Sequence, residues 1–278
     1  MNLVNWFPGH MAKAMKEIKA IQSLVDCFIV VLDARVPLSS YNDEFDQIAP
    51  HKPRLFVFTK VDLIDQNQLK PILAKFNNEN DRCVLVNLKN PKSRQKVLSA
   101  LNQILANKKA KDLQRGLVKP RLRCLVLGMP NVGKSTLINL LAKSKKTQVA
   151  NFAGTTRSTQ WINADAIQLM DTPGILMPKI EDPQVGLKLL ACNLIKQNVI
   201  NDQEFYFQIL DLLNQVSPEK IQELGIQYFE TENQKFDQLI IYGRKHQLFL
   251  KKNEVDLKKV LSQFRTKLLN LKNIIWDK

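Results

Sequence analysis

The chain has 278 residues, 45% hydrophobic and 24% charged, a composition typical of a globular protein with one large or two small domains. Its 41 Lys and Arg against 26 Asp and Glu give a formal charge of +15, and this surplus favours a polyanionic partner. The uncharged apolar runs, such as residues 27–32, are too short to span a membrane, and the first residues lack the pattern of a secretion signal, so we expect a cytoplasmic protein without membrane attachment.

Short apolar runs separated by helical stretches dominate the first half of the chain. They lie at residues 27–32, 55–58, 83–86 and 122–127. Continuous runs of this length are typical of strands buried on both faces, and intervening helices favour a parallel sheet. We predict an α/β domain at residues 23–183, preceded by an extension at 1–22 that carries a Pro-Gly-His turn.

A basic stretch precedes the fourth apolar run. Residues 89–124 contain eleven Lys or Arg and a single Asp. Such a stretch favours contact with phosphate groups. Our candidates for these contacts are Lys108, Lys109, Lys111, Lys119, Arg121 and Arg123.

The Thr59-Lys-Val-Asp62 sequence follows an apolar run as the N-K-x-D motif does in GTP-binding domains. The Asp62 carboxylate can accept hydrogen bonds from N1–H and the 2-amino group of guanine, which adenine lacks, so it favours GTP over ATP. Lys60 is expected along the base. Thr59 has a hydroxyl in place of an amide, so one loop-tying hydrogen bond is expected to be lost and nucleotide affinity to be weaker. After the next run, Asn87 and Leu88 are expected to contact the base, Leu88 through its backbone.

A phosphate-binding loop follows the run at 122–127. Gly128 to Ser135 reads G-x-x-x-x-G-K-S and leads into a helix-forming segment. In such loops backbone N–H groups face the phosphates, the lysine reaches the terminal phosphates, and the serine hydroxyl holds Mg²⁺. The predicted nucleotide contacts here are Asn131, Val132, Gly133, Lys134, Ser135 and Thr136.

The Asp171-Thr-Pro-Gly174 sequence has the features of a second switch. The Asp171 carboxylate can orient magnesium, and the Gly174 amide can sense a γ-phosphate. Before it, residues 154–157 form a candidate first switch, from which we select Thr156 as a magnesium ligand. Ile175 stands where many GTPases have a glutamine that positions the attacking water, so another group must do so.

The order of these motifs is the reverse of that in an ordinary GTP-binding domain, because the base-reading motif precedes the phosphate loop. A parallel sheet is defined by which strands are neighbours, so a domain can be re-cut in its loops if the old ends are joined. We therefore predict a circularly permuted P-loop GTPase domain with a parallel-rich sheet, joined through the basic segment at about residues 108–121.

The remainder of the chain contains amphipathic helical segments without strand patterns, and we predict a small all-helical domain at residues 184–278. Its last helix is expected to extend from Leu257 to Ile275, with an apolar stripe and a basic one. Candidate RNA contacts in this domain are Lys251, Lys252, Lys258, Lys259, Arg265 and Lys272.

Together the motifs resemble those of the circularly permuted ribosome-assembly GTPases. The matching segments are residues 6–13, 33–37, 59–62, 128–136, 171–176 and 178–179, in this order. The resemblance implies a GTP-hydrolysing factor in late maturation of the large ribosomal subunit, whose precursor and rRNA would be its partners, with ribosomal proteins as further candidates. It also implies that His10 orients the attacking water and that Asn131 helps to hold potassium beside GTP and magnesium. Off the ribosome we expect a monomer.

Two other functions stay open at this stage. A non-catalytic RNA-binding scaffold could use GTP only as a stabilising ligand. Three departures from the family pattern favour it: Ile175, Thr59, and Ala153 in place of the usual proline before the first switch. A P-loop ATPase is the other alternative, and Asp62 argues against it.

Overall fold

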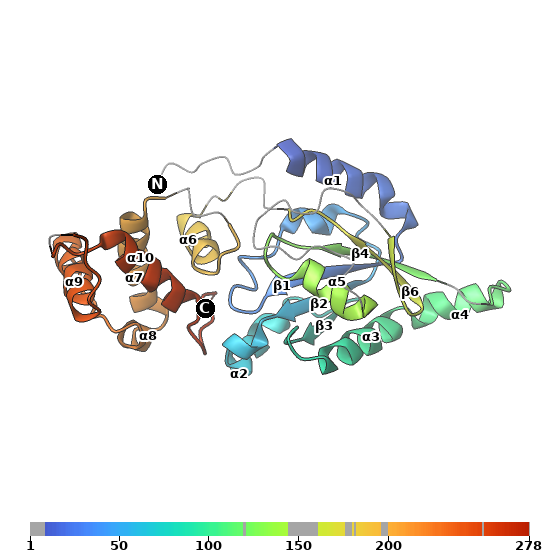
Figure 1. The fold of residues 1–278 in the computed structure, drawn as a ribbon. Coiled ribbons are helices and arrows are strands. Elements are labelled where there is room, and N and C mark those ends of the chain that lie inside the picture. Colours follow the sequence, from blue (N-terminus) through green and yellow to red (C-terminus); the bar gives the residue numbers. More distant parts are fainter. Residues whose placement is uncertain are drawn as a thin grey trace.

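The computed structural model describes residues 9–118, 121–143, 161–175, 180, 182–195, 200–251 and 253–277. In this part of the chain a sheet is enclosed by helices, and a second group of helices lies beside it (Figure 1).

The sheet is largely parallel and has six strands in the described residues. In chain order they are β1 (Cys27–Asp33), β2 (Arg54–Thr59), β3 (Arg82–Leu85), β4 (Leu122–Leu127), β5 (Trp161–Ala164) and β6 (Ile167–Asp171). Their spatial order is β3-β2-β1-β4-β6-β5, and β5 runs antiparallel to β6. The four predicted apolar runs thus form β1 to β4. The prediction that every one of these strands is buried on both faces was wrong for β3, because β3 is an edge strand and is partly exposed.

The strand pairing explains how the reordered motifs meet. β1 pairs in parallel with both β2 and β4, so that Val30 lies between Phe56 and Leu127. The strand before the phosphate loop is therefore near the centre of the sheet, although it comes fourth in the sequence. The parallel strands end at one common edge, where the loops after β2, β4 and β6 come together. The predicted circularly permuted arrangement is confirmed.

Two hydrophobic cores lie on opposite faces of the sheet. Successive side chains of a strand point to opposite faces, and β1 sends Ile29 and Val31 into one core and Val30 and Leu32 into the other. Helices α3 (Lys92–Ile104) and α5 (Lys134–Ala142) cover the first core, and α1 (Gly9–Ile21) and α2 (Gln66–Leu73) cover the second. Helix α4 (Ala106–Gln114), part of the basic join, extends away from the sheet (Figure 1).

The second group of helices consists of α6 (Pro183–Ala191), α7 (Asp202–Val216), α8 (Glu219–Glu223), α9 (Glu232–Lys245) and α10 (Leu257–Leu269). Their apolar faces share one continuous core with a face of the sheet. Among the described helices none is long and apolar enough to cross a membrane.

The last helix is shorter than its pattern predicts. Helix α10 ends at Leu269, and residues 270–277, here called the docking segment, leave the helix and run along the GTPase domain (Figure 1). Ile274, Ile275 and Trp276 are all buried, which no single face of a helix allows. The prediction that the helix extends to Ile275 was therefore wrong. The apolar residues after Leu269 are buried against the sheet domain and not within the helical bundle.

Candidate nucleotide site

The phosphate loop has a backbone that requires its glycines. Gly128 has a φ of +144°, and a Cβ on it would lie 2.4 Å from the carbonyl oxygen of Val31. Gly133 has a φ of +108° and caps α5 at its N-terminus. Because helix N-termini offer unpaired N–H groups, the loop and α5 form a cradle for anionic phosphates.

Lys134 is folded back over this loop. Its side chain is buried, and Nζ donates to the carbonyl oxygen of Met129 at 2.8 Å. Burial lowers the pKa of Lys134 to about 8, against the opposing effect of Asp171. The ammonium is thus held near the loop in a poorly solvated position, which suits contact with a polyphosphate.

Two of the three predicted magnesium ligands lie together. Ser135 Oγ donates to Asp171 Oδ2 at 2.9 Å, which joins the first turn of α5 to the end of β6. A hydroxyl and a carboxylate are the hard oxygen ligands that Mg²⁺ prefers, so this pair fits the ion. Thr156, the third predicted ligand, lies outside the described residues.

The predicted second switch, at Asp171 to Gly174, packs directly against the phosphate loop. A Cβ on Gly174 would lie 2.7 Å from the backbone nitrogen and Cα of Pro130, so only glycine permits this approach. The Ile175 N–H donates to the Gly128 carbonyl oxygen at 3.2 Å. The Ile175 side chain is fully buried in the core. An apolar side chain buried in this way offers no hydrogen bond with which to position a water.

Thr59 connects two loops of the candidate site. One is the phosphate loop, and the other is the predicted base-reading loop, which carries the Thr59-Lys-Val-Asp62 motif after β2. The buried Oγ1 of Thr59 lies 2.7 Å from the carbonyl oxygen of Val132 and 3.1 Å from that of Leu32. The expected loss of a loop-tying hydrogen bond is only partial, because the one hydroxyl proton is shared between two acceptors. Weaker nucleotide affinity remains a prediction.

Lys60 and Asp62 occupy the loop after β2. Lys60 has a left-handed backbone with a φ of 58°, and its Nζ donates to Asp33 Oδ2 at 2.7 Å and to the Asn131 carbonyl oxygen at 3.1 Å. The Asp62 carboxylate is partly exposed and lies 3.5 Å from Nζ of the exposed Lys89. It is therefore accessible to a base, with an exchangeable surface cation as its partner.

The segment with Asn87 and Leu88, which is predicted to contact the base, also reaches the phosphate loop. The Asn87 carbonyl oxygen accepts from Ser93 Oγ at 2.7 Å, and its side chain accepts from the Lys89 N–H at 2.9 Å. Leu88 Cδ1 lies 3.0 Å from where a Cβ on Gly133 would stand. The loops after β2, β3, β4 and β6 thus converge on one site.

His10 and Asn131, the residues predicted to act in hydrolysis, lie in α1 and in the phosphate loop. The backbone of His10 is helical, in α1, and not in the predicted turn, while its side chain lies outside the described set. The Asn131 side chain donates through Nδ2 to the carbonyl oxygen of Asn193 at 2.8 Å. The phosphate loop thereby contacts the end of α6.

The predicted RNA contacts in the helical domain separate into two groups. Lys251, Lys258, Lys259 and Lys272 are exposed, whereas Lys252 lies outside the described residues. The prediction of Arg265 as an RNA contact on the surface was wrong. It is buried, its Nη2 donates to Asp202 at 2.6 Å, and its guanidinium lies 4.3 Å from the centre of the Phe205 ring. Its charge is therefore paired within the bundle and is not available to RNA.

Charge in the basic join is also partly neutralised. Lys108 pairs with Asp112 at 2.6 Å and lies 3.9 Å from Asp26. Arg123 keeps its charge and is exposed, with its guanidinium 5.4 Å from the centre of the Trp161 ring. The remaining described candidates, Lys109, Lys111 and Arg121, are exposed, and Lys119 lies outside the described residues.

Sequence reasoning assigned no role to Asp33 and Arg35. Asp33 ends β1 at the same edge as the other loops, and its fully buried carboxylate contacts both Arg35 and Lys60. The signal in the sequence was a charged residue directly after the apolar run at residues 27–32.

Taken together, the sheet order and the converging loops define a circularly permuted P-loop GTPase. A model of the 50S ribosome-binding GTPase family matches residues 123–252. Ribosome biogenesis GTPase A of Bacillus licheniformis is 38% identical over 80% of this chain and 78% of its own length, and that of Bacillus cereus is 37% identical over 80% and 75%. Probable ribosome biogenesis GTPase A of Mycoplasma genitalium is 39% identical over 72% of this chain and 71% of its own length.

Solved structures show the same fold. GDP-bound TM YlqF has a TM-score of 0.65 at 23% identity and covers 94% of this chain and 98% of its own. GNP-bound YlqF from T. maritima has a TM-score of 0.63 at 24% identity, with 92% and 93% coverage. On the sequence relationships, the chain belongs to the ribosome biogenesis GTPase A family and is a GTPase.

Proposed function

We propose that this GTPase is an assembly factor of the large ribosomal subunit that binds rRNA in its GTP state and leaves when GTP is hydrolysed. The observation that carries the proposal is membership of a family whose named relatives are ribosome biogenesis GTPases. The contact between the phosphate loop and the end of α6, made by Asn131 and Asn193, supports it. This contact offers a short route from the nucleotide to the helices that would hold RNA.

In the proposed site, Lys134 contacts the terminal phosphates, Ser135 and Asp171 hold magnesium, and Asp62 reads the guanine. Magnesium would supply charge neutralisation at the β- and γ-phosphates. The Asn131 side chain is the proposed potassium ligand, through its amide oxygen. Because Ile175 is buried, His10 is proposed to orient the attacking water, and an imidazole can do so near neutral pH.

The function is tested by GTP turnover in potassium buffer with and without large ribosomal subunits. We expect strong stimulation by the particle. If GTP binds but is not hydrolysed in either condition, the result would favour the non-catalytic scaffold. This alternative is tested because the buried Ile175 replaces the usual water-positioning glutamine. A sodium buffer separates the potassium proposal from the rest, since only the former requires the rate to fall in sodium.

The His10→Ala substitution is expected to lower subunit-stimulated turnover by about 10²–10⁴, the usual contribution of a positioned acid or base. GDP affinity should not change. Lys13→Ala is a matched control, because Lys13 lies in the same helix with its side chain 78% exposed. Equal turnover in the two variants would remove His10 from the mechanism.

RNA binding is expected to weaken steeply with salt. Neutralised phosphates release counterions, so the removal of each phosphate-binding lysine should reduce the slope of log K against log salt by about 0.7–0.9. The exposed pair Lys258 and Lys272 can be replaced by alanine, with the exposed pair Lys70 and Lys75 of the GTPase domain as a control of equal charge. Identical slopes for the two double variants would place RNA elsewhere.

Nucleotide binding is expected to take up a proton at alkaline pH. Burial lowers the Lys134 pKa to about 8, and a bound polyphosphate would raise it again. Affinity for GDP should therefore be flat below pH 8 and fall by up to about tenfold per pH unit above it. Calorimetry in buffers of different ionisation enthalpy measures the uptake at pH 7 and pH 9. Uptake that persists in Lys134→Arg, whose side chain stays charged, would come from another group.

A further inference from the structure

Asp33, Arg35 and Lys60 form an ionic cluster next to the base-reading loop, here called the junction. Asp33 accepts from the Arg35 Nε at 3.0 Å, from Arg35 Nη2 at 2.8 Å and from Lys60 Nζ at 2.7 Å. Asp33 is fully buried, and Arg35 is nearly so. Burial alone would raise the pKa of Asp33, but the two cations hold it well below the usual range. The carboxylate is therefore a fixed charge between two cations.

The junction constrains Lys60 in a specific way. Asp33 pairs with Thr59 across β1 and β2, which places the carboxylate next to the residue that begins the loop. Lys60 adopts a left-handed backbone that non-glycine residues rarely take and that the surroundings must enforce. Its two ammonium contacts, to Asp33 and to the Asn131 carbonyl oxygen, hold the side chain in place, and its own carbonyl oxygen accepts from the Leu63 N–H at 3.0 Å.

On its other side the junction reaches the helical domain. Arg35 Nη2 donates to the Cys192 carbonyl oxygen at 3.0 Å, and Nη1 donates to that of Leu269 at 3.4 Å. These residues are the C-cap of α6 and the last residue of α10. Helix C-termini carry partial negative charge and unpaired carbonyl groups, so a guanidinium between two of them is favourable.

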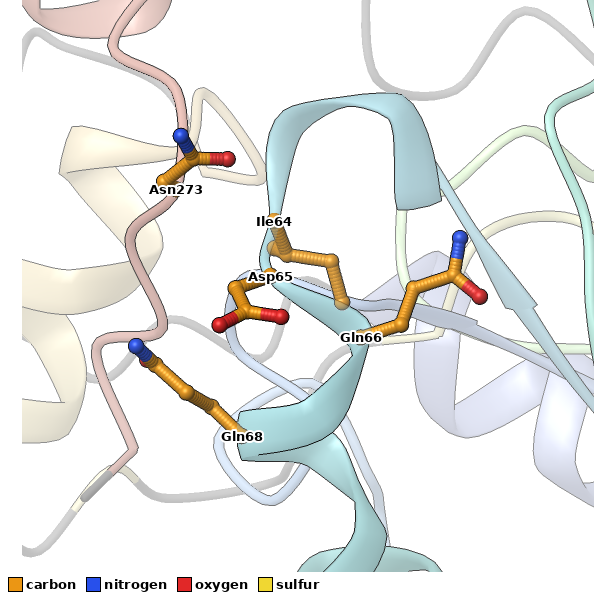
Figure 2. Close-up of a pocket in the computed structure, with 5 residues that line it drawn as sticks. All are labelled: Ile64, Asp65, Gln66, Gln68 and Asn273. Atoms are coloured by element: carbon orange, nitrogen blue, oxygen red, sulfur yellow. The ribbon is translucent and has the colours of Figure 1, made fainter.

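The docking segment contacts the same region through its backbone. The Trp276 N–H donates to the Arg35 carbonyl oxygen at 2.8 Å, and the Asn273 N–H donates to that of Leu63, next to Asp62. A polar pocket of ≈ 450 Å³ lies between Asn273 and the start of α2 (Figure 2). The base-reading loop is thus held by the sheet on one side and by the docking segment on the other.

We infer that Asp33 is a positioning residue for Lys60, and that Arg35 links this position to the ends of α6 and α10, so that guanine binding and docking of the helical domain reinforce each other. The inference rests on the proposed base contact of Lys60. It assigns a function to an ion pair that otherwise would only stabilise the fold.

The test is a double-mutant cycle on GDP affinity. Removing Asp33 alone would leave Arg35 buried without its partner, so the better variant is the neutral pair Asp33→Asn with Arg35→Gln. We expect this pair to weaken GDP binding about tenfold when Lys60 is present and not to weaken it further in a Lys60→Ala background. Affinity for tripolyphosphate, which has no base, should stay unchanged. The preference for GDP over xanthosine diphosphate, set by Asp62, should stay unchanged as well.

Asp81→Asn provides a matched control, because Asp81 is also buried and accepts from the Arg54 N–H at 2.7 Å at the start of β2, far from the nucleotide loops. Its GDP affinity should equal that of the unmodified protein. Additive effects in the cycle would overturn the role of Asp33. Unchanged affinity in Lys60→Ala itself would instead overturn the proposed base contact.

Hydrogen exchange tests the link to the helical domain in the folded protein. GDP is expected to slow exchange of the Asn273 and Trp276 amides, and this protection should be lost in Lys60→Ala at saturating GDP. Equal protection in both proteins would overturn the coupling through Arg35.

Discussion

Replacing Gly174 by alanine is expected to reduce GTP turnover by about 100-fold, because the added methyl group would lie 2.7 Å from the Pro130 backbone. The neighbouring segment must then move away, which breaks the hydrogen bond from the Ile175 N–H to Gly128. A displacement of about 1 Å at a catalytic centre is sufficient for a loss of this size. GDP affinity should fall much less, since the contact proposed for Gly174 is with the γ-phosphate, which GDP lacks. Turnover with saturating GTP and subunits measures the effect.

Gly186→Ala is the control for this substitution. A Cβ on Gly186 would meet its nearest neighbour, Cγ2 of Ile180, at an ordinary distance of 3.8 Å. Alanine is also the better helix former, so this variant is expected to be as stable as the unmodified protein or more stable by up to about 1 kcal/mol. Normal turnover in Gly174→Ala would show that the second switch is not held as tightly as the geometry requires.

Which parts of the fold could be predicted depended on burial. The strands β1 and β2 are covered on both faces, and β4 is covered except at Arg123, so apolar residues dominate all three. β5 was missed because it is four residues long, lies at the edge and alternates between partly exposed and buried residues. The order of the motifs predicted the circular permutation, whereas the order of the strands in the sheet came only from the structure.

The helical part was harder because its pattern has two explanations. Apolar residues continue at helical spacing beyond Leu269, but they are buried against the GTPase domain. Arg265 lies on the expected basic stripe, yet Asp202 and Phe205 enclose it. Neither contact can be deduced from spacing within one helix, because both depend on distant segments.

The candidate site could likewise be predicted only where it depends on local sequence. Features that belong to one motif, such as the position of Ser135 at the start of α5, could be predicted from the residues of that motif. The contacts of Asp33 and Arg35 could not, since they join β1 to the ends of α6 and α10, more than 150 positions away.

The docking segment is expected to contribute strongly to stability, and Trp276 is its anchor. Trp276 is 2% exposed and packs in the core shared by the sheet and the helices. Trp276→Ala should lower the free energy of unfolding by about 3–5 kcal/mol, the cost of removing a large buried aromatic side chain. Urea unfolding of the full chain measures this. The exposed Lys272 of the same segment offers a control, since Lys272→Ala removes no packing.

Asp277 fastens the same segment by polar contacts. Its Oδ2 accepts from the N–H groups of Leu38 and Ser39, each at 2.8 Å, and its Oδ1 accepts from the Ser39 hydroxyl and lies 3.3 Å from Lys188 Nζ. Asp277→Asn places an NH₂ group among these donors and should cost about 1–3 kcal/mol. If Trp276 and Asp277 hold one docked segment, their effects should be less than additive, because undocking caused by either substitution removes the contacts of the other. Full additivity would mean that the two residues stabilise the fold independently, and that the segment stays docked when either is replaced.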